Sequence, residues 1–592
     1  MSKEKEKDIE GNLSDHTAYE DHHGRRHPSI EDPVDLEKAS VTQSDGRLSS
    51  EHDDDAHRLD LHEKNSRGQP ADPYEEDVAE RVLTRQRSAT PTNRSRRSFA
   101  SSRHQPPAAP PQQPPVPLSD LDAGIVGWDS QDDPNLPLNF SSNRKWAIVG
   151  FVSAITFLTP FASTILAPAI SQLHDELMTG DASDDLTLAS MPISIYLLGY
   201  AVGPLFLSGL SEIYGRHIIL CGANVFFCLS LIGNGLAPSL GALIAFRFLT
   251  GVGGSGCLTI GGGIIADMIP VHQRGKAITI WMLGPLIGPT IGPLIGAYVT
   301  QDIGWRWTVW IVLIAAVPTV CAIAVLSQET NPRVLIHRKT VRLRAELGRP
   351  ELRSAYLDPA AAPQTAAAIL ARGLLRPVRL LFTSPLLFAL SLYIAFCYGV
   401  LYLLFNTIPL VFQDTYGFDL GTTGLVYIPM GVGYAISMTL FSFLSDRTVM
   451  RLTTANGGKY EPEMRLVDCI YFACLLPITF FWYGWAAEAR THWIAPILAL
   501  LPFGIGIVGV WQPIQAYLID AFTEYAASAL AAFTVFRSIV AAFLPLAGPR
   551  MYGALGLGWG NSLLGFIALA MIPVPLVICK FGGRLRARKL DV

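Results

Sequence analysis

Twelve runs of about 20 apolar residues recur along this chain from Trp146 onward, and each is long enough to cross a hydrocarbon core of roughly 30 Å. A backbone in lipid must satisfy its own polar groups, and an α-helix does so within one segment. We therefore expect an all-α membrane protein with twelve transmembrane helices. The expected spans are 146–170, 188–210, 218–236, 240–264, 278–300, 307–326, 386–412, 425–444, 467–486, 493–518, 526–546 and 562–581.

The spans fall into two sets of six, which predicts two pseudo-symmetric six-helix bundles at 144–326 and 386–581. A basic central loop, 327–385, connects them, and a basic C-terminus, 582–592, follows the last span. Lys and Arg concentrate in these segments, whereas the expected outer loops carry only Arg306, Arg490 and Arg550. By the positive-inside rule, this asymmetry places both termini in the cytoplasm.

The first 143 residues differ sharply from the rest of the chain. They are rich in Asp, Glu, Ser, Arg, His and Pro, and they hold too few apolar residues to offset the entropy of ordering. We expect residues 1–143 to form a long, disordered cytoplasmic tail. The eight cysteines all lie in apolar runs, which favours buried thiols over a metal site.

Similar charged segments follow the second and eighth spans. Glu212, Gly215 and Arg216 lie in the first segment, and Asp446 and Arg447 lie at the corresponding place in the second half. Two copies in register indicate an internal repeat. Secondary transporters use such repeats to rock two bundles around a midplane site.

The fifth span contains a glycine every four residues, at positions 284, 288, 292 and 296, together with three prolines. Four-residue spacing places the glycines on one helical face, where another backbone can approach closely. Neighbouring helices make prolines tolerable in a membrane helix. We interpret this glycine stripe as the sliding surface between the two bundles.

Together these motifs resemble the major facilitator superfamily over about Trp128–Lys589. The resemblance implies that Glu212 pairs with a helix end of the other half and that Arg216 holds the loop, which locks the outward-facing state. Arg247 matches an arginine that the family links to proton transfer. Gly288, Gly292, Pro293 and Gly296 match the antiporter motif, which is associated with exporters rather than uptake symporters.

Proton coupling is the least determined part of this expectation, because no Asp or Glu lies near the centre of an expected span. Our hypothesis is that coupling runs through Glu212 and Asp267, with Arg247 opposing them. The alternative for Arg247 is a structural arginine that donates hydrogen bonds to backbone carbonyls of a neighbouring helix, because a cation in the membrane must be paired or hydrated.

Further matches, including Phe536-Arg537-Ser538 in the eleventh span, resemble the fungal multidrug and polyamine proton antiporters. Substrate-binding candidates are polar or aromatic residues expected near the midplane. They are Tyr196, Tyr200, Tyr402, Asn406, Gln512, Gln515 and Arg537. A mostly apolar site with sparse polar groups suits amphipathic organic molecules.

The expected function is proton-coupled efflux of a drug, toxin or secondary metabolite across the plasma membrane. The expected partners are a small organic substrate, protons and the bilayer, with no nucleic acid, no metal and no cofactor beyond the proton gradient. We expect a functional monomer without enzymatic activity. The alternatives are a polyamine exporter, a nutrient uptake symporter and a transporter-derived receptor.

Overall fold

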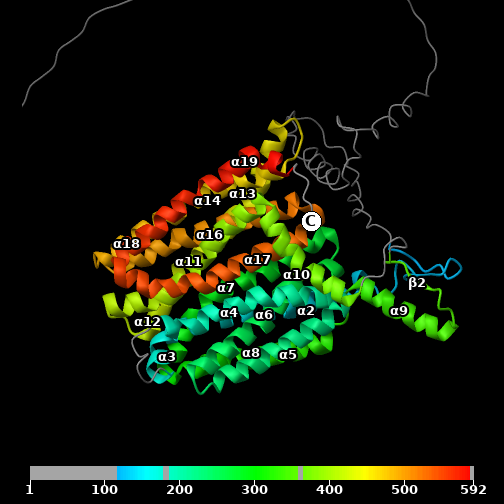
Figure 1. The fold of residues 1–592 in the computed structure, drawn as a ribbon, viewed down its shortest axis with the longest axis horizontal. Helices are drawn as coiled ribbons and strands as arrows, with labels where there is room; N and C mark the ends of the chain where they lie inside the picture. The colour runs from blue at the N-terminus through cyan, green and yellow to red at the C-terminus, as the bar shows by residue number, and fades with distance from the viewer. Residues whose placement is uncertain (1–115, 178–185, 358–364, 587–592) are drawn as a thin grey trace, which may run out of the picture. The chain divides into compact units, whose positions relative to one another are not determined.

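The computed structural model describes residues 116–177, 186–357 and 365–586, most of which are helical (Figure 1). The first half contains α2 Ser142–Thr164, α3 Ile170–Leu177, α4 Leu186–Ile213, α5 Arg216–Gly235, α6 Leu240–Met268, α7 Val271–Ile303 and α8 Trp305–Leu326. The second half contains α11 Pro385–Tyr416, α12 Leu420–Thr423, α13 Ile428–Ala455, α14 Val467–Ala473, α15 Leu475–Glu488, α16 Ile494–Ala521, α17 Ala526–Phe543, α18 Gly548–Met571 and α19 Pro573–Arg586. The predicted all-α membrane fold is confirmed.

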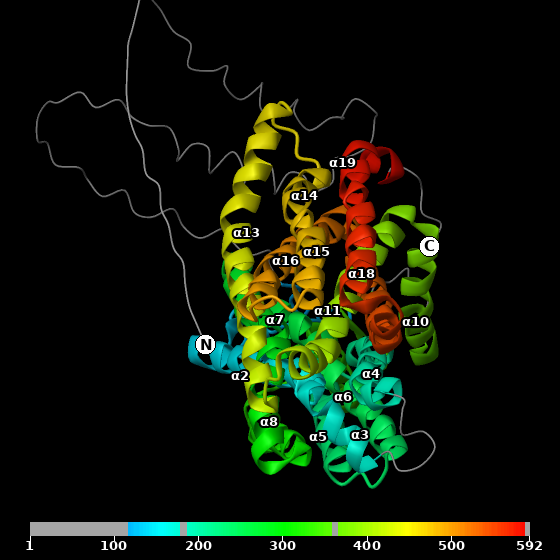
Figure 2. The same ribbon diagram turned by 90° about the vertical axis from the view of Figure 1, so that its left-hand side faces the viewer.

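The two halves repeat one packing pattern. In the first half α2 packs against α7, α4 against α6, and α5 against both α6 and α8. In the second half α11 packs against α17, α13 against α16, and α15 against both α16 and α18. The same pairs of spans therefore meet in each half, as two pseudo-symmetric bundles require. Figure 2 shows the yellow-to-red helices of the second half gathered together, beside the cyan-to-green helices of the first.

Eleven helical runs of the described residues are long and apolar enough to cross a membrane, and the last of them covers 61 residues, Ala526–Arg586. A straight helix of that length would extend about 90 Å, three times the hydrocarbon thickness. The run is instead broken at Gly556, whose φ of 73° and ψ of 174° are not helical. The orange α17 with the part of α18 before Gly556, and the rest of α18 with the red α19, thus form two crossings, which contain the eleventh and twelfth predicted spans (Figure 1).

The prediction of a disordered tail through residue 143 is wrong for its last part, and residues 1–115 lie outside the described residues. Strand β1, Ile125–Val126, pairs in parallel with β2, Arg353–Ser354, of the central connection. The indole Nε1 of Trp128 donates to the Tyr356 hydroxyl at 3.0 Å, and Trp128 packs in a small apolar core with α9, Pro332–Leu347. The end of the tail and the connection therefore fold together.

The two halves contact each other along several helices. Helix α4 packs against α17 and against α10, Ala366–Thr383, which belongs to the central connection. Helix α7 packs against α12, α13 and the short 3-10 helix Gly424–Tyr427. Here the backbone N–H of Gly421 donates to the Gln301 side-chain oxygen at 2.5 Å. Residues of α4, α7, α11 and α17 are thus placed where the halves meet.

Candidate functional site

Three of the predicted substrate-binding tyrosines are buried on helices that meet at this interface. Tyr196 and Tyr200 of α4 have ring centroids 5.2 Å apart, and the Tyr196 hydroxyl donates to the Thr159 carbonyl of α2 at 2.7 Å. One turn later on α2, the Ser163 hydroxyl is 2.9 Å from the Tyr402 hydroxyl of α11. The Ser163–Tyr402 hydrogen bond joins the first half directly to the second.

Arg537 of α17 lies beside this pair, enclosed by aromatic rings of the second half. Its guanidinium carbon is 4.2 Å from the ring centroid of Trp511, 4.6 Å from that of Tyr398 and 5.9 Å from that of Phe533. Only 7% of Arg537 is exposed, and its Nε and Nη1 have no hydrogen-bond partner among the described residues. Sequence reasoning missed Tyr398 and Trp511, because aromatic residues in membrane helices usually only pack.

The three predicted amide ligands differ in how their polar atoms are satisfied. Asn406 of α11 is 1% exposed, and both its Oδ1 and Nδ2 are unpartnered within the described residues. Gln515 accepts a hydrogen bond from the Trp511 indole at 2.9 Å, and Gln512 is half-buried one turn before it. An orphaned buried amide costs free energy unless a ligand or water completes its bonds. Asn406 therefore has the stronger case for contacting substrate.

Arg247 of α6 makes the contacts that the structural alternative describes, and its role opposite the coupling acids stays a prediction. Its Nε donates to the Pro192 carbonyl at 2.9 Å, and Nη1 and Nη2 donate to the Ala162 and Ser163 carbonyls at 2.8 Å each. Asp267 follows 20 residues later on the same helix, which places it about 30 Å away along the axis. Arg247 clamps α2 and α4 to α6.

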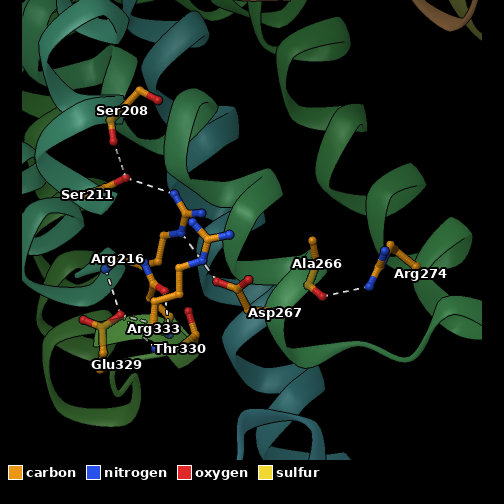
Figure 3. A network of polar contacts seen from close by, with 10 residues as sticks. Ser208, Ser211, Arg216, Ala266, Asp267, Arg274, Glu329, Thr330 and Arg333 are labelled. Carbon is orange, nitrogen blue, oxygen red and sulfur yellow. Dashed lines mark hydrogen bonds and ion pairs between the residues drawn. The ribbon is translucent and has the colours of Figure 1, made fainter. Parts of the chain in front are cut away.

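A compact polar network lies where α4, α5, α6 and the connection meet (Figure 3). Arg216, at the first position of α5, donates from Nε to Asp267 at 3.4 Å and from Nη1 to the Ser211 hydroxyl at 3.0 Å. The side chains of Arg216 and Asp267 are each 19% exposed. The structure therefore brings together Arg216 and Asp267, two of the predicted coupling residues.

Glu329, which sequence reasoning missed, anchors this network from the segment that follows α8. Its Oε1 accepts from the backbone N–H groups of Arg216 at 2.8 Å, Thr330 at 3.0 Å and Asn331 at 2.9 Å. Gly215 has φ of 111°, and a β-carbon there would collide with the Glu329 carboxylate. Only glycine fits this turn. The sequence feature that could have identified Glu329 is its position as an isolated acid shortly after the sixth span.

The remaining predicted gating residues lie at exposed positions. Glu212 is exposed, and it has no hydrogen bond or ion pair within the described part of the chain. The pairing of Glu212 with a helix end of the other half stays a prediction. Asp446 and Arg447 are also exposed, and they lie inside α13, which continues to Ala455. The second charged segment is therefore helical rather than a copy of the first loop.

The glycine stripe does not face the other half, so its interpretation as a sliding surface between bundles is wrong. A β-carbon on Gly284 would lie 2.8 Å from the Phe157 nitrogen, and one on Gly288 would lie 2.9 Å from the Phe157 carbonyl oxygen. Gly292 and Gly296 approach the next two turns of α2 as closely. The stripe packs α7 against α2 within the first bundle.

One of the prolines of α7, Pro293, is accommodated by the same contact. Pro293 has no N–H, so the carbonyl four residues earlier, on Pro289, loses its helical donor. The Thr164 hydroxyl of α2 donates to that carbonyl at 2.9 Å. A different face of α7 meets the second half, where Thr290, Leu294, Tyr427 and Tyr434 help to line an apolar groove of about 220 Å³.

Two packed six-helix bundles with a buried aromatic and cationic cluster between them define a polytopic membrane transporter. A family model described as Major Facilitator Superfamily matches residues 152–545. The MFS transporter cpaT of Aspergillus oryzae is 46% identical over 462 residues, which cover 78% of this chain and 91% of that protein. The efflux pump radE of Floropilus chiversii is 44% identical over 468 residues, which cover 79% of this chain and 85% of that protein. The chain belongs to the major facilitator superfamily.

The solved structure of the xylose transporter XylE from E. coli, in a partially occluded inward-open conformation, has the same fold. The TM-score is 0.55 at 16% identity, with 74% of this chain and 98% of that chain covered.

Proposed function

We propose that this transporter exports small amphipathic organic molecules across the plasma membrane in exchange for protons, by alternating access. The observation that carries the proposal is the buried cluster of Tyr196, Tyr200, Tyr402 and Arg537 between the two halves. Aromatic surface with few polar groups suits an amphipathic ligand. The outward direction is supported by the relative named as an efflux pump and by the resemblance of Gly288, Gly292, Pro293 and Gly296 to the antiporter motif.

We assign the proton-responsive role to Asp267. Its carboxylate pairs with Arg216, whose backbone is held by Glu329 in the segment after α8. A proton on Asp267 removes the charge that attracts Arg216, which weakens one of the contacts that hold the turn between α4 and α5. Helix α4 packs against α17 of the other half, so this turn is a place where protonation can bias the arrangement of the two bundles.

The runner-up function is polyamine export. It is less favoured, because Arg537 would put a buried cation beside a polycationic substrate. An uptake symporter remains an alternative because the xylose transporter shares the fold, and fold does not determine the direction of transport. We further propose that the protein works as a monomer, without enzymatic activity, and with both termini in the cytoplasm.

Cells that lack their own drug pumps provide the test of export. The chain is expressed beside an Asp267→Asn variant, and efflux is followed for three dyes of different charge: Nile red, fluorescein and rhodamine 6G. We expect at least one dye to leave faster with the native chain, and a protonophore to abolish the difference. Faster accumulation of every transported dye would indicate uptake instead. Full protonophore-sensitive export by Asp267→Asn would remove Asp267 from the coupling mechanism.

A further inference from the structure

We propose that Arg537 binds an acidic group of the substrate, and that the transported molecules are amphipathic organic anions with a carboxylate or phenolate on a planar, conjugated skeleton. This inference rests on the proposed transport function, but it concerns only what the central site binds. It depends on the difference between Arg247 and Arg537, the two buried arginines among the described residues.

Arg247 and Arg537 are both almost fully buried, at 1% and 7% exposure. Arg247 is satisfied, because all three of its nitrogens donate to backbone carbonyls. Arg537 has no hydrogen bond or ion pair in the described part of the chain, and its Nε and Nη1 are orphaned. A buried unpaired charge is strongly unfavourable, and aromatic faces compensate only part of that cost. An oxyanion supplies the acceptor that Arg537 lacks, in the forked geometry that guanidinium groups favour.

The surroundings of Arg537 select the rest of the ligand. Trp511 already donates its indole N–H to Gln515, so the ring has no unsatisfied polar atom and presents only aromatic surface. Tyr398 stacks edge to face on Trp511, with ring centroids 5.6 Å apart. Flat conjugated groups pack well against such rings. An inorganic anion would use only the guanidinium and leave this surface without a role.

A second polar contact is available farther along α11. The orphaned amide of Asn406 follows Tyr398 by eight residues, which corresponds to about 12 Å along the helix axis. A ligand that contacts both Arg537 and Asn406 carries its acid at one end and a hydrogen-bonding group at the other. A cationic ligand meets the like charge of Arg537 and is disfavoured. The expected order of affinity is anion, then neutral molecule, then cation.

Binding of matched probes to the purified full-length protein in lipid nanodiscs tests this order. The probes are 2-naphthoate, 2-naphthamide and 2-naphthylmethylammonium, which share one ring system and differ in charge. Equilibrium affinities are measured by microscale thermophoresis for the native chain and for Arg537→Gln and Arg537→Lys. Arg451→Gln is the control, because Arg451 is an exposed arginine of α13. Circular dichroism verifies the folding of each variant.

We expect 2-naphthoate to bind the native chain at least about tenfold more tightly than 2-naphthamide, as one charge-assisted hydrogen bond implies. Arg537→Gln should remove that preference, Arg537→Lys should keep part of it, and Arg451→Gln should leave it unchanged. The proposal is wrong if the native chain binds the amide equally well, if Arg537→Gln retains the preference, or if no naphthyl probe binds at millimolar concentration. Competition by chloride with no gain from the naphthyl ring would identify an inorganic anion site and also overturn it.

These binding measurements need no proton gradient, so they can refute the anion site without refuting the proposed function, and the reverse. Preference for 2-naphthoate in a protein that does not export dyes would support the anion site and refute proton-driven efflux. Export of dyes without any charge preference in binding would support proton-driven efflux and refute the anion site.

Discussion

Gly288→Ala tests whether the glycine stripe packs α7 against α2. The new β-carbon would lie 2.9 Å from the Phe157 carbonyl oxygen and 3.0 Å from the Phe161 nitrogen, whereas ordinary contacts lie at 3.4–4 Å. Both neighbours are backbone atoms, so no side chain can rotate away, and the helices must part by about 0.5 Å. Overpacking of this kind costs about 1–3 kcal/mol.

The matched control is Gly275→Ala on the same helix, where a β-carbon would have nothing within 4 Å. This variant gains only the helix propensity of alanine, up to about 1 kcal/mol. Apparent melting in detergent, followed by size-exclusion chromatography after heating, should place Gly288→Ala several degrees below Gly275→Ala. Equal melting of the two variants would refute the close approach of α2 and α7, and with it the structural role of the stripe.

Three further variants test other contacts. Glu329→Gln removes the charge that holds three backbone N–H groups, so it should lower the apparent Tm by an amount equivalent to about 1–3 kcal/mol; an unchanged Tm would contradict the anchor. In Arg247→Lys, the lysine side chain cannot reach three carbonyls at once, so the folded yield should fall. Transport by the protein that does fold should keep its pH dependence. Transport that is independent of pH would instead indicate a coupling role for Arg247. Trp128→Ala should speed hydrogen exchange at residues 353–355 and leave the membrane helices unaffected, and exchange at the native rate would show that the tail does not hold the connection.

The helices could be predicted from the sequence because their length and hydropathy are local properties that lipid imposes on every span. The fold of the tail could not be predicted, because Trp128 bonds to Tyr356 across 228 positions and no local pattern announces that contact. The glycine stripe could be predicted only in part. Four-residue spacing correctly indicated a close approach, but spacing on one helix does not say which helix approaches.

The candidate site was predicted in part. Tyr196, Tyr402 and Arg537 lie where the halves meet, because polar groups in apolar spans usually face the interior. The sequence could not decide between the two roles weighed for Arg247, because its partners are backbone carbonyls, and these have no signature in the sequence. Glu329 was missed because it acts on backbone N–H groups brought together by a turn. Both cases concern contacts with the main chain.

Proton-driven transport in proteoliposomes tests the central claim most directly. Vesicles with the protein inserted inside-out, an acidic lumen and a neutral exterior are given whichever of the three dyes the cells exported. We predict accumulation in the lumen above the level of protein-free vesicles, which collapses when a protonophore is added, whereas Asp267→Asn exchanges dye only to equilibrium. Accumulation that is the same with and without the pH gradient, or that is driven in the opposite direction, would contradict proton-coupled export.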